Sequence, residues 1–145
     1  MRVAVFCASA NEVEPCYFRE AGRLGKRIGE LGWQLIYGGT NIGLMREVAD
    51  ATIRQGGEVT GIIPECIRDR GVAAGGLKQL GQHNKPIVFL NTAGYYKLFF
   101  EFIEHSRKAK FISSAYDHLY YIADAVEPAL DYIQKYQPIP QVKKY

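Results

Sequence analysis

The chain has 145 residues, 48% of them hydrophobic and 23% charged, with a net charge of +3. This length suits one domain with a buried core, and the composition is that of a soluble globular protein. No apolar run approaches the roughly 18 residues of a membrane span, and lysines and arginines are scattered, so we expect neither membrane insertion nor nucleic-acid binding. Three cysteines without CxxC spacing, and no signal peptide, predict the cytoplasm.

Apolar and amphipathic runs alternate along the first part of the chain. Continuous apolar runs predict strands at residues 3–7, 33–37 and 58–63, the first of them buried on both faces. Helical periodicity predicts helices from Pro15 to a stop at Gly32, and over residues 44–55. This β-α-β-α-β order predicts a parallel sheet with right-handed crossovers.

Both of these helices have an apolar side at helical spacing. In the first it consists of Phe18, Ala21, Leu24, Ile28 and Leu31, and in the second of Leu44, Val48, Ala49 and Thr52. The first helix also contains Gly22, Gly25 and Gly29, each of which costs roughly 1 kcal/mol relative to alanine. We expect close packing against the sheet to offset this cost.

The pattern is weaker in the second half of the chain. Residues 66–85 contain no convincing strand, and strands are predicted again at 86–90 and 118–123. A helix is predicted over 95–108, with Tyr95, Leu98, Phe99, Phe102 and Ile103 on its apolar side. Asp124 and Glu127 form a capping-box pattern before a last helix, whose predicted core face is Val126, Leu130 and Ile133.

A candidate ligand site follows from the ends of the predicted strands, because ligands of open parallel sheets bind outside the carboxyl ends. Here the hydroxyls of Ser9 and Thr40 and the glycines Gly38 and Gly39 lie in strand-to-helix turns. Backbone amides at the helix start, from Gly43, Leu44 and Met45, carry the positive end of the helix dipole. We predict a phosphate site with Glu65 as the facing acid; a tight structural corner is the alternative.

Familiar nucleotide motifs are absent. The first strand-to-helix turn lacks GxGxxG, and the second strand ends in Tyr37-Gly38 instead of an acid, which excludes an NAD-type site. Leu44-Met45 stand where a P-loop needs Lys-Ser/Thr. His83, His105 and His118 lack metal-ligand spacing, and Cys7 fits a small buried thiol better than a nucleophile.

Several motifs together resemble the LOG family of cytokinin riboside 5′-monophosphate phosphoribohydrolases, formerly described as lysine decarboxylases. The matching segments are VFCAS at 5–9, YGGTNIGLM at 37–45, VADA at 48–51, GIIPE at 61–65, QLGQHNKP at 79–86 and NTAGYY at 91–96. They occur in the family order and span most of the chain. The departures are Thr40 in place of the family's third glycine and Arg46 in place of the glycine after Leu-Met.

The resemblance implies a fold and an activity. It implies a three-layer α/β/α, Rossmann-like domain over residues 1–145 that forms a homodimer. It implies cleavage of the N-glycosidic bond of an N6-modified AMP-like nucleotide, the step that activates cytokinins, without a metal or redox cofactor. A carboxylate would stabilise the oxocarbenium-like transition state, by analogy with glycosidases.

One part of the family pattern has no match in this chain. The family's Arg-Lys helix and PGGxGTxEE turn are absent, and residues 68–73 lead almost directly to 77–80. We therefore expect a missing segment near 71–77 and assign no catalytic residue. Three hypotheses remain open: a nucleotide N-glycosidase, a non-catalytic binder of nucleotides or phosphosugars, and an inert fragment.

Overall fold

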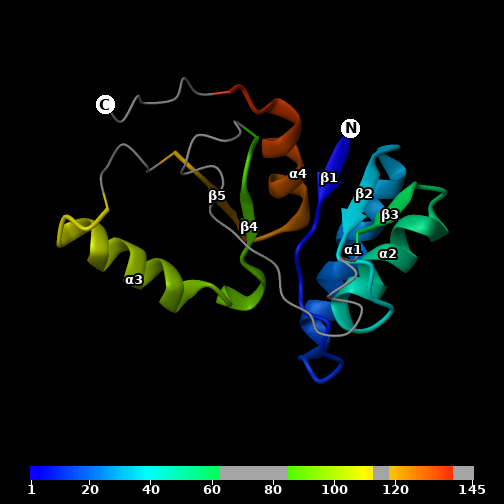
Figure 1. Ribbon diagram of the computed structural model, residues 1–145, viewed down its shortest axis with the longest axis horizontal. Coiled ribbons are helices and arrows are strands. Elements are labelled where there is room, and N and C mark those ends of the chain that lie inside the picture. The colour runs from blue at the N-terminus through cyan, green and yellow to red at the C-terminus, as the bar shows by residue number, and fades with distance from the viewer. Residues whose placement is uncertain (63–84, 113–117, 139–145) are drawn as a thin grey trace. The chain divides into compact units, whose positions relative to one another are not determined.

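The computed structural model describes residues 1–62, 85–112 and 118–138 (Figure 1). The chain divides into two compact units, Met1–Ala73 and Ala74–Tyr145, and each is described by itself. The predicted strand end at Glu65, the gap expected near 71–77 and His83 lie outside the described residues. The assignment of residues 1–145 to one domain stays a prediction.

The first unit has the predicted β-α-β-α-β order. Its elements are β1 (Arg2–Ala4), α1 (Pro15–Glu30), β2 (Gln34–Tyr37), α2 (Gly43–Arg54) and β3 (Val59–Gly61). All pairs are parallel, in the order β1-β2-β3, with Leu35 of β2 opposite Val3 on one side and Val59 on the other. The predicted parallel sheet and α/β class are confirmed.

The core of this unit lies between the sheet and two helices that pack against each other (Figure 1). Both crossovers advance the chain in the same direction across the sheet, so right-handed connections place α1 and α2 on one face. Ile28, Leu35, Val48 and Thr52, from α1, β2 and α2, are all fully buried. Leu44, Val48, Ala49 and Thr52 therefore form the inner side of α2 as predicted, with Leu44 half-buried.

The predicted burial of the first strand on both faces is wrong. In β1 only Val3 is buried, and the following Phe6 is 77% exposed. The physical reason is that β1 is an edge strand of the three-stranded sheet and that α1 and α2 share one face. Among residues 1–62, which are the described part of this unit, no helix covers the opposite face.

The α1 glycines pack against a helix, and the expectation that they pack against the sheet is wrong. A Cβ atom on Gly25 would lie 2.2 Å from the Val48 carbonyl oxygen, and one on Gly29 would lie 2.6 Å from the Gln55 Cβ atom. The Thr52 hydroxyl lies 3.1 Å from the Gly25 carbonyl oxygen, in the same seam. Close approach of α1 to α2 is what requires glycine.

The second unit is a smaller parallel arrangement of β4 (Val88–Leu90), η1 (Thr92–Gly94), α3 (Lys97–Lys108), β5 (Tyr121–Ala123) and α4 (Val126–Lys135). β4 pairs with β5, with Phe89 opposite Ile122. α4 contacts both strands, and Ala123, Val126, Ala129 and Leu130 form the buried core. The strands and helices again follow the predicted order.

Aromatic rings join β4 to the beginning of α3. Phe89 lies 5.1 Å from Tyr96, 5.9 Å from Phe99 and 5.2 Å from Phe100, measured between ring centroids. Most of the predicted apolar side of α3 lies on the surface instead: Tyr95, Leu98, Phe99 and Phe102 are exposed and Ile103 is half-buried.

The predicted capping box at α4 does not form. The residue before the helix is Ala125, and it has no side-chain cap. Asp124 instead accepts a hydrogen bond of 3.2 Å from Asn91 Nδ2. Asn91 follows β4 and Asp124 follows β5, and parallel pairing brings both residues to the same edge of the sheet. The Asp124 carboxylate therefore bonds to Asn91 and not to the start of α4.

Candidate functional site at the start of α2

The turns after β1 and β2 lie at the same edge of the first sheet, because the two strands are parallel. The turn after β2 contains Gly39 at φ +73° and leads to Gly43 at φ +61°, the first residue of α2. Both values lie in the left-handed region, where a side chain is strained. The predicted glycine-rich strand-to-helix turn is therefore present.

The loop between β1 and α1 contacts the first turn of α2. The Gly43 N–H donates a hydrogen bond of 2.9 Å to Asn11 Oδ1, and the Met45 N–H donates one of 3.3 Å to the Ala8 carbonyl oxygen. A Cβ atom on Gly43 would lie 2.5 Å from the carbonyl carbon of Ser9, so the loop backbone rests directly on the helix start. Two amides expected to face a ligand have acceptors within the protein.

The Thr40 side chain belongs to the same turn. Its hydroxyl lies 3.1 Å from Met45 Sδ, which would itself be 3.2 Å from a Cβ atom on Gly38. The Met45 side chain thus covers Gly38 and faces Thr40. Ser9 is exposed, and its backbone lies against Gly43.

The predicted site residues therefore fall into three groups. Gly38, Gly39, Thr40, Gly43, Leu44 and Met45 form one continuous turn and helix start. Ser9 lies across from them in the neighbouring loop. Glu65 lies outside the described residues. Their role in phosphate binding stays a prediction.

Electrostatics at this edge favour an anion and do not favour a cysteine nucleophile. The first turn of α2 contains no acidic residue, so the helix dipole there is not neutralised from within the turn. Cys7 follows β1, and burial raises the pKa of its thiol to about 11. Because the thiolate is the reactive form, Cys7 is a weak nucleophile at neutral pH.

Sequence reasoning missed the role of Asn11. Its position in a polar turn after the first strand was visible, but its partner Gly43 is 32 residues away. Asn91 is a similar case in the second unit: its Oδ1 atom accepts a hydrogen bond of 2.9 Å from the Tyr96 N–H. An asparagine directly after a predicted strand was the available signal in the second case.

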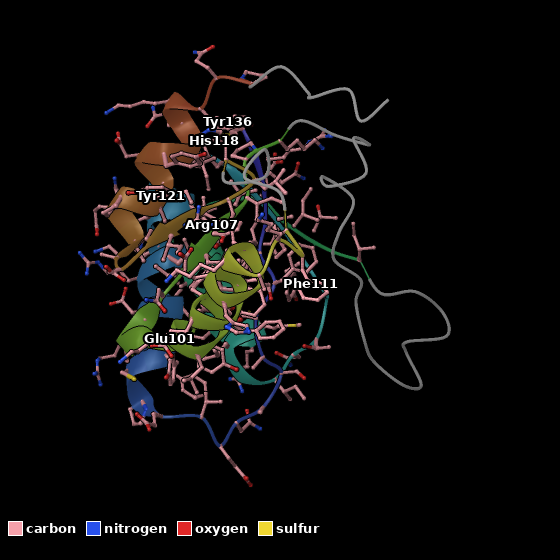
Figure 2. All side chains as sticks on the ribbon, turned by 90° about the vertical axis from the view of Figure 1, so that its left-hand side faces the viewer. Glu101, Arg107, Phe111, His118, Tyr121 and Tyr136 are labelled. Atoms are coloured by element: carbon pink, nitrogen blue, oxygen red, sulfur yellow. The ribbon has the colours of Figure 1, made fainter. Side chains whose placement is uncertain are left out.

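Open grooves in the second unit contain none of the predicted site residues. One, of about 460 Å³, is lined by Tyr121, Pro128, Asp131, Tyr132, Lys135, Tyr136 and Gln137. Another lies along α3 and includes Glu101, which, like Arg107, projects from that helix (Figure 2). In the first groove the rings of Tyr121 and Tyr132 stack, with centroids 4.4 Å apart and an interplanar angle of 9°.

Comparison with protein families gives two matches that together span most of the chain. Residues 1–78 match the SLOG cluster4 family. Residues 72–133 match the family described as possible lysine decarboxylase. The first match alone covers more than half of the chain, including every residue of the β2–α2 turn.

Curated relatives of this chain include plant phosphoribohydrolases. The chain is 27% identical over 179 residues to the probable cytokinin riboside 5′-monophosphate phosphoribohydrolase LOGL6 of Oryza sativa subsp. japonica, covering 94% of this chain and 72% of the relative. It is 27% identical over 180 residues to LOG5 of Arabidopsis thaliana, covering 95% and 79%. These alignments are longer than the 145 residues of this chain, so the relatives contain residues without a counterpart here.

Solved structures with the same fold include carriers of the molybdenum cofactor. The carrier protein of Chlamydomonas reinhardtii superposes with a TM-score of 0.63 at 20% sequence identity, covering 92% of this chain and 96% of the other. The molybdenum cofactor binding protein of Rippkaea orientalis superposes with a TM-score of 0.56 at 18% identity, covering 85% and 89%. At these identities the likeness shows the fold.

Proposed function

Since this chain belongs to the LOG family, we propose that it hydrolyses the N-glycosidic bond of a nucleoside 5′-monophosphate with an N6-modified adenine. In this reaction the bond between the base and C1′ breaks and the oxygen of water adds to C1′. A proton from water goes to the departing base. The products are the free base and ribose 5-phosphate.

The observation that carries this proposal is the likeness to phosphoribohydrolases over almost the whole chain. The proposed phosphate site is the edge formed by Ser9, Gly38, Gly39, Thr40 and the start of α2, with Glu65 as the acid facing it. Helix-start amides bind phosphate well, and a fixed phosphate would position the sugar for attack by water. The cytoplasm remains the proposed compartment, in keeping with the cysteine usage.

A second candidate function is binding without catalysis, of a nucleotide or another phosphate-bearing ligand. The chain contains no PGGxGTxEE motif, and that motif carries the acid that the resemblance assigns to chemistry. Proteins of the same fold include carriers of the molybdenum cofactor. Such a binder would keep the phosphate site at the start of α2 and would not cleave the glycosidic bond.

The proposal is tested with isopentenyladenosine 5′-monophosphate as substrate and the unphosphorylated nucleoside as its matched control. We expect release of free base, measured by chromatography, from the monophosphate alone, because the phosphate anchors the sugar. Calorimetry with AMP is run in parallel. Binding of AMP without base release would favour the binder, and absence of both binding and release would overturn both candidates.

We further propose that the protein acts as a homodimer in which the exposed apolar side of α3 contributes to the interface. Leu98 and Phe102 of α3 are 78% and 64% exposed, and Tyr95, just before the helix, is 68% exposed. Side chains of this size on one helix side bind a partner surface in many proteins. A second copy is the partner that the family resemblance implies.

A further inference from the structure

The contact between the β1–α1 loop and α2 occupies backbone groups that a helix cannot satisfy by itself. The first N–H groups of any helix lack acceptors within the helix. In α2 the Gly43 N–H has Asn11 Oδ1 as its acceptor at 2.9 Å, and the Met45 N–H has the Ala8 carbonyl oxygen at 3.3 Å. The longer of these two bonds is beyond the ordinary range for an N–H···O hydrogen bond. Asn11 therefore makes the stronger contact.

The two sides of this contact differ in how firmly they are held. Gly43 is buried, and α2 continues into the core through Val48 and Thr52. Ala8, Ser9, Ala10 and Asn11 are all exposed. The loop side of this contact is therefore open to solvent, while its backbone covers the buried Gly43.

We propose that Asn11 is an autoinhibitory contact, an internal occupant of the Gly43 amide that the ligand phosphate must displace. This inference rests on the proposed function, because it concerns the same phosphate site. The Asn11 oxygen belongs to a neutral amide, whereas a phosphate is an anion. Hydrogen bonds to charged acceptors are roughly twice as strong as neutral ones, and the helix dipole adds to the difference. Phosphate therefore replaces Asn11, and the contact lowers the apparent affinity until it does.

Two substitutions at Asn11 separate this role from a purely structural one. Asn11→Asp places a carboxylate on the Gly43 amide, which stabilises the helix start and competes with phosphate. We expect a higher melting temperature together with AMP affinity weakened by roughly tenfold or more, measured by calorimetry. Asn11→Ala removes the competitor, so we expect a lower melting temperature and affinity about threefold to tenfold tighter.

If the role of Asn11 were purely structural, AMP affinity would change in the same direction as the melting temperature in both variants. Asn11→Asp would then bind AMP more tightly and Asn11→Ala more weakly. Asn41→Asp is the matched control: it adds the same charge in the exposed turn before α2, and we expect a smaller loss of affinity. Wild-type affinity in both Asn11 variants would overturn the inference and leave the proposed function intact. Failure of wild type and both variants to bind AMP would overturn the proposed function, and the inference with it.

Discussion

At the scale of single residues, burial changes the chemistry of Cys7. Surrounding protein disfavours the charged thiolate, and this desolvation raises the pKa of the Cys7 thiol from 9.0 to about 11. The same residue lies at the sheet edge that carries the candidate site. Its environment therefore argues for a packing role, although Cys7 is half-buried and not the fully buried thiol predicted from sequence.

The pKa of Cys7 predicts a pH dependence of stability. Between about pH 9 and pH 11 the unfolded thiol loses its proton while the folded thiol keeps it. The native state then binds more protons, so the free energy of unfolding falls as pH rises through this window and levels off above it. Urea unfolding of wild type and Cys7→Ala across this range measures the effect. Parallel curves for the two proteins would contradict it.

At the scale of elements, the seam between α1 and α2 sets the packing of the first unit. The two helices approach so closely that Gly25 faces the Val48 backbone carbonyl and Gly29 faces the Thr52 backbone carbonyl. A helical glycine is unfavourable by itself, so the close approach is what makes it the better residue here. The glycines of α1 are therefore not equivalent, because their neighbours differ in how easily they move.

Alanine substitutions at two α1 glycines test this difference. At Gly25 the new methyl group would lie 2.2 Å from a backbone oxygen, so we expect a loss of about 1–3 kcal/mol in the free energy of unfolding. At Gly22 it would meet Glu47 Oε1 at 2.8 Å, the end of a side chain that can turn away. Gly22→Ala should be neutral or stabilising by up to about 1 kcal/mol. Equal changes in the free energy of unfolding for the two variants, measured by chemical denaturation, would contradict the proposed difference between these glycines.

At the scale of the whole molecule, the second unit leaves large apolar side chains uncovered. The ring of Phe89 in β4 packs against Tyr96, Phe99 and Phe100. Leu98 and Phe102 are exposed to solvent. Phe111, just beyond α3, is 89% exposed (Figure 2). Across the described residues, no helix has the length and hydropathy needed to cross a membrane. The exposed apolar side chains of α3 are the surface that we propose for the second copy of the chain.

The proposed dimer predicts a change of mass on substitution in α3. We expect wild type to sediment as a dimer at micromolar concentration and the variant Leu98→Glu/Phe102→Glu to sediment as a monomer, because buried charges oppose association. Lys97→Glu introduces the same charge at an exposed polar position of the same helix and should stay dimeric. A monomeric wild type at all accessible concentrations would refute the dimer, whereas a dimeric double variant would place the interface elsewhere.

The sequence by itself determined the order of strands and helices, the parallel pairing and the glycine-rich turn before α2. These features follow from local periodicity and from residue types at fixed spacing, which one chain displays directly. The order of the motifs also indicated the family, because the matching segments can be recognised in the sequence without knowing which residues contact one another. The predicted limits of α1, Pro15 and Gly32, also differ little from its observed bounds, Pro15–Glu30.

Only the tertiary structure decided which groups meet across long separations. The Gly43 amide donates a hydrogen bond to Asn11, and the α1 glycines pack against α2. One face of β1 is exposed, and Asp124 accepts a hydrogen bond from Asn91. Each of these outcomes depends on which elements lie side by side. Hydrogen bonds and steric contacts act over a few ångströms in space, and sequence spacing does not report that distance when the partners are 32 residues apart.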